Sequence, residues 1–388
     1  KNILSKVFQD DRILIFLRWI DRVSISDTTD YDYQIELNKN KEKWFISTGL
    51  TDIEVEESVR NWLNKQITDE DITIPEKYEN IQKTKITFAV ERAGSKLVGT
   101  TNSKVYNYLP TEIDFGFKFL INGDFIPDGS RTELHDNEWN NYLGKIAGKK
   151  FVEWLSVLGN HNWIYNGKAR NFDRDYLNLV PNFSEPKALS AGKNTFFLEK
   201  FKEGFKDAIA GNEPISFIPT KSGKLEILSK TFIDETELSA VLTSDFSTLT
   251  GITLEPIHND VGEGLNRVKA LINEYGIGKI FTLINLKECF QQDNFKTWLK
   301  TPVNNFKVLK HLFYSPNTDI KYLLETEKII LTESGELLKA EEIYSTIPVE
   351  VAFISNNKIN STLKALLDKS KVELKTTKFN ATEFLISN

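Results

Sequence analysis

Arg131 is the residue of this chain whose sequence surroundings are best suited to chemistry. An apolar run over residues 115–126 leads into a Pro-Asp-Gly segment at 127–129, which is followed by Ser130. Pro presets φ, Asp bonds its own backbone and Gly supplies positive φ, so the segment specifies a tight turn. Ser130 and Glu133 have the spacing of a capping box, which predicts that a helix begins here.

The guanidinium of Arg131 defines the chemistry that this junction could perform. In the first turn of a helix, its planar fork would be held rigidly and could bind a phosphate or a carboxylate in bidentate fashion. The alternative is a first-turn arginine in a surface salt bridge, which contributes little. On residue chemistry alone the salt bridge is the commoner outcome.

The other reactive residue types form no recognised constellation. No pair of histidines has metal-ligand spacing, and a single cysteine cannot build a thiolate site; the histidines are His135, His161, His258 and His311. There is no Gly-x-Ser-x-Gly elbow, and Cys289 lies in an expected helix, where a buried structural thiol is predicted. The sequence therefore predicts neither a metal centre nor a nucleophile.

No complete nucleotide pocket is present in the motifs of this chain. It lacks both Gly-x-x-x-x-Gly-Lys-Ser/Thr and Gly-x-Gly-x-x-Gly. The segment at 144–150, GKIAGKK, superficially resembles a phosphate loop. It falls inside an amphipathic pattern, so it is predicted to be helical with a basic outer face.

Composition places the chain among soluble globular proteins. Its 388 residues carry a formal net charge of −6, with both signs mixed along the chain, so nucleic acid is an unlikely partner. One cysteine fits a reducing compartment, and no apolar run or signal peptide indicates a membrane. We therefore expect a cytoplasmic protein with no membrane partner. Methionine is absent, so we expect either a piece of a longer protein or a sequence from which residues such as a modified methionine are left out.

Residues 1–158 are expected to form an α+β region. Apolar periodicity predicts helices over 10–20, 53–66 and 139–158. Alternating or β-rich runs predict strands over 22–26, 85–90, 105–109 and 115–125. A hairpin is predicted to join 33–37 with 43–47. The expected arrangement is helices packed on a mixed sheet.

The remainder is expected to form a linker followed by a second α/β region. Residues 159–193 are rich in Asn, Asp, Pro and Gly, which is typical of a linker or loop. Residues 194–388 alternate helices with short strands, and the first helix is capped by Asn194. Two segments, 217–225 and 329–337, share a Thr-x-Ser-Gly-x-Leu pattern. They are either a duplicated structural unit or a common hairpin that arose twice.

Several of these segments together resemble sacsin-like proteins of the GHKL ATPase superfamily, which includes the ninety-kilodalton heat-shock chaperones. The resemblance covers about residues 10–158. The residues that carry it are Tyr108-Leu-Pro-Thr111, Gly116-Phe-Lys-Phe119, Ile121-Asn-Gly-Asp-Phe125, Ser130-Arg131 and Trp139-Asn140. The two Thr-x-Ser-Gly-x-Leu segments are similar to elements that follow the ATPase part of that family.

The resemblance implies that this chain is a middle-domain-like region downstream of an ATP-binding domain. Arg131 would then be the catalytic arginine delivered to the γ-phosphate, with Ser130 and His135 as cofactor-binding neighbours. ATP and Mg would be bound mainly by the missing N-terminal domain, because its Glu-x-x-x-Asn and Asp-x-Gly-x-Gly motifs do not occur before residue 10. Thr132 and His135 depart from the chaperone pattern.

The resemblance also implies a role and partners. The parent protein would be an ATP-dependent chaperone or ATPase, and this fragment alone would be inactive. Its partners would be its own N-terminal ATP-binding domain and a protein client, and a homodimer is compatible. Two alternatives stay open: a non-catalytic protein-interaction scaffold, and part of a nucleic-acid-linked GHKL ATPase, for example in bacterial defence.

Overall fold

The computed structural model describes most of the chain, and its fold class is α+β. The described residues are 11–17, 20–26, 34–39, 43–47, 52–71, 73–94, 96–160, 162–165, 168–171, 174–189, 192–344 and 357–377. Helices accompany a mixed sheet that contains both parallel and antiparallel strand pairs. The predicted fold class is confirmed.

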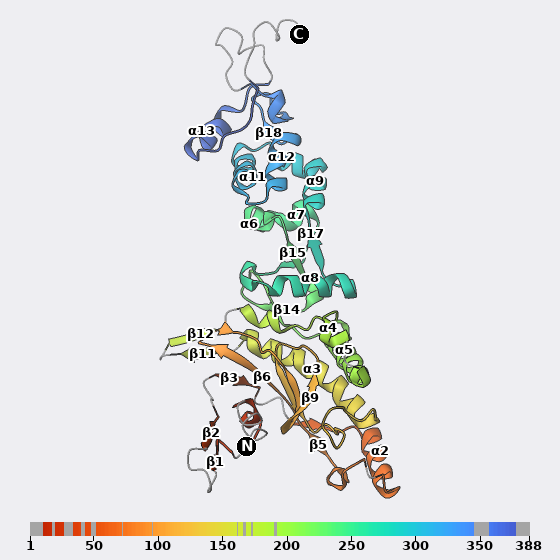
Figure 1. The fold of residues 1–388 in the computed structure, drawn as a ribbon. Coiled ribbons are helices and arrows are strands. Elements are labelled where there is room, and N and C mark those ends of the chain that lie inside the picture. The colour runs from red at the N-terminus through yellow and green to blue at the C-terminus, as the bar shows by residue number, and fades with distance from the viewer. Residues whose placement is uncertain are drawn as a thin grey trace, which may run out of the picture. The chain divides into compact units, whose positions relative to one another are not determined.

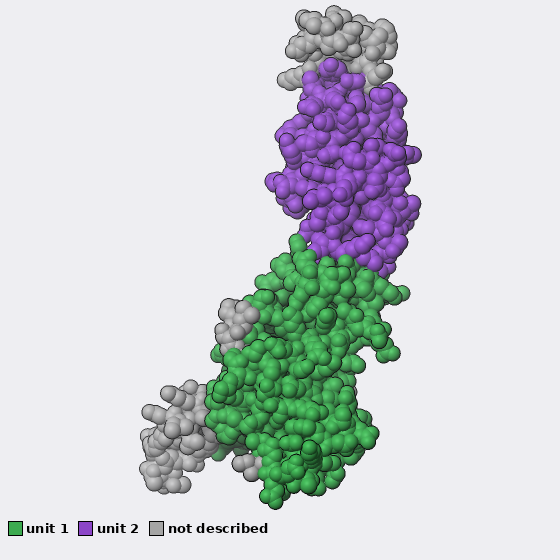
Figure 2. Space-filling model, turned by 90° about the vertical axis from the view of Figure 1, so that its right-hand side faces the viewer, with its two compact units in different colours: residues 1–231, 257–278 green, residues 232–256, 279–388 purple. Residues whose placement is uncertain are grey.

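The chain divides into two compact units (Figure 2). Unit 1 comprises residues 1–231 and 257–278, and unit 2 comprises residues 232–256 and 279–388. The chain therefore enters unit 2, returns to unit 1 and then enters unit 2 again. The linker predicted at 159–193 falls inside unit 1, so the border between compact units lies further along the chain than the composition indicated.

A six-stranded sheet forms the framework of unit 1 (Figure 1). Its strand order is β3-β6-β10-β8-β9, and β7 also pairs with β6. The strands are β3 (Trp44–Ile46), β6 (Ile86–Ala93), β7 (Lys96–Leu97), β8 (Lys104–Asn107), β9 (Leu109–Asp114) and β10 (Leu120–Gly123). The central strand β10 is antiparallel to β6 and parallel to β8. All four residues of β10 are buried, which explains why its sequence lacks an alternating pattern.

Two helices, α3 (Glu138–Asn160) and α5 (Thr195–Ala210), supply much of the unit 1 core. Both predicted helices are confirmed, but the predicted side-chain cap is wrong, because the side-chain oxygen of Asn194 accepts from the amide of Leu134 at 2.8 Å instead. Phe119 before β10 stacks on Phe151 of α3 with ring centroids 4.3 Å apart. Phe88 of β6 stacks on Trp154 at 5.3 Å, and Phe201 of α5 contacts Phe151 at 5.9 Å. These fully buried rings join the sheet to both helices.

Glycines allow α3 and α5 to approach closely. A Cβ atom at Gly148 would lie 2.0 Å from the carbonyl oxygen of Phe201, and one at Gly204 would lie 1.8 Å from that of Lys145. Such distances leave no room for a side chain at either position. The GKIAGKK segment is thus helical, as predicted, and its glycines serve helix packing.

The N-terminal elements differ from the prediction in pairing. β1 (Arg22–Ser26) is confirmed, but it pairs with β2 (Gln34–Asn38), whereas β3 pairs with β6. The predicted 33–37/43–47 hairpin is therefore wrong, because each strand finds a partner outside the pair. The helix predicted over 10–20 is reduced to a short 3-10 turn, η1 (Asp11–Leu14), and residues 10, 18 and 19 lie outside the described ones.

The remaining elements of unit 1 complete its borders. The predicted helix at 53–66 is α2 (Glu57–Thr68), preceded by a short strand. The others are β4 (Ile53–Glu54), η2 (Glu76–Tyr78), β5 (Lys83–Thr84), β11 (Asn162–Tyr165), β12 (Lys168–Asn171), η3 (Arg174–Leu179), α4 (Pro186–Leu189), η4 (Gly192–Asn194), η5 (Leu228–Lys230), η7 (Asn259–Val261) and α8 (Gly264–Tyr275). Tyr176 and Leu177 of η3 are buried, so this part of the predicted linker belongs to the core. His161 lies outside the described residues.

Unit 2 is mainly helical and contains a small sheet. β15 (Thr231–Asp234) lies between β16 (Glu255–Pro256) and β17 (Lys279–Phe281), and β15 and β17 are parallel. Its helices are α6 (Leu238–Leu242), η6 (Thr243–Asp245), α7 (Phe246–Thr250), α9 (Leu283–Gln291), α10 (Asp293–Leu299), α11 (Pro302–Tyr314), α12 (Thr318–Thr326) and α13 (Ser361–Lys369). Cys289 of α9 is buried in the unit 2 core, as predicted.

The two Thr-x-Ser-Gly-x-Leu segments fold into hairpins with the same hydrogen bonds. The first joins β13 (Ile218–Pro219) to β14 (Leu225–Glu226), and the second joins β18 (Ile330–Leu331) to β19 (Leu337–Leu338). The amide of Thr220 donates to the carbonyl of Lys224 at 2.9 Å, and the amide of Thr332 donates to that of Glu336 at 2.9 Å. Each threonine hydroxyl also contacts the serine hydroxyl two residues later at 2.8 Å.

The likeness continues after the hairpins. Each is followed by a 3-10 turn, η5 or η8 (Ala340–Glu342). Thr220 then bridges to Ile257 and Thr332 to Ile359 in antiparallel fashion. A helix follows each bridge, α8 in the first case and α13 in the second. This shared order favours a duplicated structural unit over two independent hairpins.

Candidate functional site

Residues 127–134, here called the Arg131 loop, form a closed loop and no helix. The carboxylate of Asp128 accepts hydrogen bonds from the amides of Thr132 and Glu133, at 2.8 and 3.0 Å, and from the Ser130 hydroxyl. These bonds hold the pKa of Asp128 well below its usual range. The predicted helix start at Ser130 is wrong, because Asp128 takes the amide donors and Arg131 has a φ of +60°. The helix begins at Glu138.

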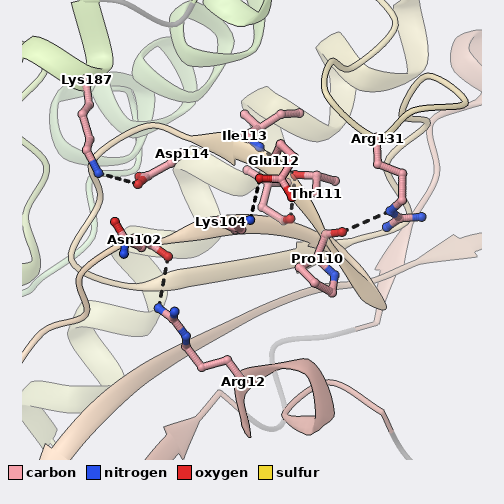
Figure 3. A network of polar contacts seen from close by, with 11 residues as sticks. Arg12, Asn102, Lys104, Pro110, Thr111, Glu112, Ile113, Asp114, Arg131 and Lys187 are labelled. Atoms are coloured by element: carbon pink, nitrogen blue, oxygen red, sulfur yellow. Dashed lines mark hydrogen bonds and ion pairs between the residues drawn. The ribbon is translucent and has the colours of Figure 1, made fainter. Parts of the chain in front are cut away.

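The guanidinium of Arg131 donates to three backbone carbonyls at the β8–β9 turn. Its Nε atom lies 3.1 Å from the oxygen of Pro110, and its Nη2 atom lies 2.7 Å from that of Leu109 and 3.2 Å from that of Asn107. The carbonyl of Arg131 in turn accepts a hydrogen bond from the amide of Glu112 at 2.8 Å. Figure 3 shows the side chain directed at Pro110. The loop is thus fastened to β9 by both side chain and backbone.

The charge of Arg131 has no carboxylate partner among the described residues. Burial, with no anion to offset it, lowers the pKa of this half-buried guanidinium, yet an arginine stays protonated at any ordinary pH. Both N–H groups of Nη1 also lack a partner within the described part of the chain. The guanidinium can therefore accept an anion through Nη1 while its other nitrogens keep it oriented.

A second arginine holds the other end of β8. Arg12 donates from Nη1 to the carbonyls of Thr101 and Asn102, at 2.7 and 3.2 Å, and Figure 3 shows this contact before β8 and the Arg131 contact beyond it. Nearby charges are paired: Lys104 of β8 with Glu112 of β9 at 2.7 Å, and Asp114 of β9 with Lys187 of α4 at 2.6 Å.

Asp124, between the end of β10 and the Arg131 loop, is the centre of a polar network. Its backbone carbonyl accepts hydrogen bonds from the Tyr78 hydroxyl at 2.9 Å and from the Trp139 indole at 2.7 Å. Its carboxylate accepts from the Thr84 hydroxyl at 2.9 Å and from the Tyr108 hydroxyl at 3.0 Å. The Asn-Gly-Asp and Trp-Asn motifs of the sequence therefore meet at one residue.

Asn140 fixes the start of α3 against the strand that leaves β10. Its side-chain oxygen accepts from the amide of Ile126 at 2.9 Å, and its Nδ2 donates to the carbonyls of Ile126 and His135 at 2.9 and 2.8 Å. Asn140 is fully buried, so these bonds satisfy all of its hydrogen-bonding groups except one acceptor position. The Trp-Asn motif is thus a structural anchor for the loop.

The structure brings together some of the predicted site residues. Ser130 and Arg131 share the loop, but Ser130 is exposed and bonds Asp128 and Thr132. His135 forms backbone bonds at the end of the loop, and within the described residues no hydrogen bond or ion pair joins its ring to Ser130 or Arg131. Hydrogen bonds from Thr73 lower the pKa of Asp71, and the charge of His135 lowers it further by a small amount.

Sequence reasoning did not identify Tyr108 as a site residue, although it borders the site. Tyr108 has a φ of +59°, and Arg131 has one of +60°. Non-glycine residues rarely adopt this conformation, and bulky ones least often. Within the described residues, the other positive-φ residues of this type lie at turns or near helix ends, and they are Glu70, Asn80, Asn102, Glu237, Thr243 and Lys371. Tyr108 opens the Tyr-Leu-Pro-Thr segment of the sequence, but nothing in that segment indicates a positive φ at the tyrosine.

Other chemistry is not assembled in the described residues. They contain no group of three or more His, Cys, Asp or Glu side chains able to hold a metal ion. Burial raises the pKa of the Cys289 thiol to about 11, which makes it a poor nucleophile. The carboxylate of Glu342 accepts from the amide of Lys339 at 2.9 Å and so caps η8.

Comparison with known proteins adds no relative. No family model, curated protein or solved structure matches the chain. In the described part of the chain, no helix combines the length and apolar character needed to cross a bilayer. The class defined so far is an α+β protein in which a mixed sheet presents a strained, carbonyl-bound arginine.

Proposed function

We propose that this chain is the middle part of a GHKL-type ATPase or ATP-dependent chaperone, and that Arg131 binds the γ-phosphate of ATP held by a separate domain. The supporting observation is the state of the guanidinium. It is positively charged, oriented by three carbonyls, and without a carboxylate partner among the described residues. A charged and oriented guanidinium without a carboxylate partner is stabilised most by an anion that binds from outside the chain.

In this proposal each nitrogen of the guanidinium has its own task. Nε and Nη2 keep the plane of the guanidinium fixed against the β8–β9 turn. Nη1 then stabilises negative charge on the transferring phosphoryl group, with little reorganisation when the charge develops. ATP would be held mainly by the separate domain, and the magnesium ion with it. The chain supplies the arginine and transmits the position of the loop to α3 through Asp124 and Trp139.

The alternative is a scaffold in which Arg131 only ties the loop to β9. The observation that favours this alternative is that three hydrogen bonds of the same guanidinium already end on carbonyls of the chain. In that case the arginine contributes to stability and not to turnover. Substitution separates the two roles.

The test uses the longer protein that contains this sequence and its ATP-binding domain. Arg131→Gln should lower kcat for ATP hydrolysis by about 10³-fold, the lower end of the range for a phosphate-binding arginine. Arg131→Lys should not restore the rate, because an ammonium cannot reproduce the fork. Arg12→Gln is the matched control, since Arg12 also donates to carbonyls beside β8. Equal rates for wild type and Arg131→Gln would refute the catalytic role and favour the scaffold.

A further inference from the structure

Tyr108 links Arg131 to Asp124, and this link determines where the Arg131 guanidinium lies. Tyr108 is the residue between Asn107 and Leu109, the two residues whose carbonyls both accept from Nη2. The direction of those carbonyls therefore depends on the backbone conformation of Tyr108. That conformation is left-handed, with φ at +59°.

Two hydrogen bonds keep Tyr108 in this conformation. Its amide donates to the side-chain oxygen of Asn122 at 2.8 Å, and its hydroxyl donates to the carboxylate of Asp124 at 3.0 Å. Asn107 is held as well, because its Nδ2 donates to the carbonyl of Phe125 at 2.7 Å. These three acceptors belong to β10 or to the two residues after it, so the central strand helps to set the turn.

The exposure of Tyr108 argues against a role in packing. Its side chain is 45% exposed, and an exposed tyrosine contributes little apolar burial. A strained backbone conformation at a residue that adds little to the core is typical of functional positions. The constraint is thus best explained by what Tyr108 positions.

We infer that Tyr108 is a positioning residue for Arg131, and that Asp124 acts through it. This inference rests on the proposed function, because it concerns the same guanidinium. The tyrosine hydroxyl holds the turn, the turn holds the two carbonyls, and the carbonyls direct Nη2 so that Nη1 faces the phosphate. Loss of the hydroxyl leaves the arginine in place but frees its plane to rotate.

The first test measures ATP turnover by the longer protein. Tyr108→Phe should lower kcat roughly tenfold with KM for ATP nearly unchanged, because misplacement of a positioned group slows chemistry without weakening ground-state binding. Combined with Arg131→Gln, it should cause no further loss, since both changes act through one group. Tyr322→Phe is the control, as Tyr322 is also exposed, at 59%.

The second test needs no turnover and uses the chain described here. Hydrogen exchange at the Arg131 Nε–H, followed by ¹⁵N NMR, should quicken in Tyr108→Phe but not in Tyr322→Phe, with the melting temperature unchanged in both. Asp124→Asn keeps one acceptor oxygen, so it should quicken exchange less than Tyr108→Phe.

The outcomes distinguish this inference from the proposed function. If Arg131→Gln lowers kcat while Tyr108→Phe changes neither kcat nor exchange, Tyr108 does not position the arginine and the proposed function stands. If Arg131→Gln leaves kcat unchanged, the proposed function fails, and the inference fails with it. Additive losses in the double variant would also overturn the positioning role.

Discussion

The turns of the two repeated hairpins and the Arg131 loop use left-handed backbone in different ways. In the hairpins the left-handed residues are Gly223 and Gly335, with φ of +82° and +80°. In the site they are Tyr108 and Arg131. Glycine adopts this conformation without steric cost, whereas other residues pay about 1–3 kcal/mol. The chain uses glycine where only the turn matters, and it keeps a side chain where the side chain contacts other residues.

The comparison also separates two kinds of polar turn. Each repeated turn closes on itself through its own threonine, which bonds the serine and a carbonyl within the turn. Arg131 and Tyr108 instead bond residues of other strands. The hairpin turns are therefore held by hydrogen bonds within the turn. The conformation of the Arg131 loop instead depends on the positions of β8, β9 and β10.

Replacement of Arg131 by glycine gives the largest expected effect. Under the proposed function, Arg131→Gly should lower kcat for ATP hydrolysis by the longer protein by about 10³-fold. Its free energy of unfolding should change by only about 1 kcal/mol, because relief of the backbone conformation offsets the lost hydrogen bonds. Steady-state ATPase assays and urea unfolding measure the two quantities. A variant that keeps its activity but loses stability would show that the arginine is only structural.

Replacement of a glycine that is required by close packing, and not by a positive φ, gives the next largest effect. Gly148→Ala should destabilise unit 1 by about 3 kcal/mol, because its Cβ would overlap the carbonyl of Phe201 and force α3 and α5 apart. Gly144→Ala is the graded control, since its closest new contact is 3.1 Å. Urea denaturation followed by tryptophan fluorescence measures both. Equal stabilities would contradict the close helix contact.

Paired substitutions in the hairpins test whether the two turns are equivalent. Gly223→Ala and Gly335→Ala should each destabilise their own unit by about 1 kcal/mol, since a Cβ has open space at both and only φ opposes it. Gly129→Ala, also in open space but without positive φ, should change stability by less than about 0.5 kcal/mol. Amide hydrogen exchange reports each unit separately. Different losses of stability for Gly223→Ala and Gly335→Ala would show that the two turns are not equivalent.

Acid should loosen the Arg131 loop before it affects the repeated turns. The pKa of Asp128 is lowered in the folded state, so its stabilising contribution is present above the unfolded pKa of about 3.9 and is lost as pH falls toward the folded value. The protection of the Thr132 and Glu133 amides against exchange, relative to the intrinsic rate at each pH, should therefore fall progressively below about pH 4. Asp128→Asn should show faster exchange already at neutral pH, and Asp136→Asn should not. A loop whose exchange has no such pH dependence would contradict the role of Asp128.

Local sequence patterns predicted those elements whose buried residues recur at a regular spacing along the chain. The apolar stripes of α3 and α5 identified both helices, because a helix of that length must bury one face. The burial of Cys289 and the two hairpins also followed from short-range signals. The Arg131 loop was predicted as a helix because Ser130 and Glu133 have capping-box spacing. In the structure the carboxylate of Asp128 accepts hydrogen bonds from the amides of Thr132 and Glu133 instead.

Strand partners and the borders of the units were not readable from the sequence. β2 and β3 each have the composition of a strand, but no local sequence pattern indicates that β2 pairs with β1 and β3 with β6. Strand pairing depends on residues far apart in the chain, and any β-rich segment can satisfy it. The return of residues 257–278 to unit 1 is equally non-local.

The sequence by itself determined the α+β class, the main helices, the repeated hairpins and the choice of Arg131 as the residue to examine. These follow from periodicity and turn chemistry, which act over a few residues. Only the tertiary structure decided that Tyr108 and Asp124 belong with Arg131, because they converge through β8 and β10. It also decided that glycines at 148 and 204 serve contact between helices, since a side chain is excluded there by a neighbour that is distant in the chain.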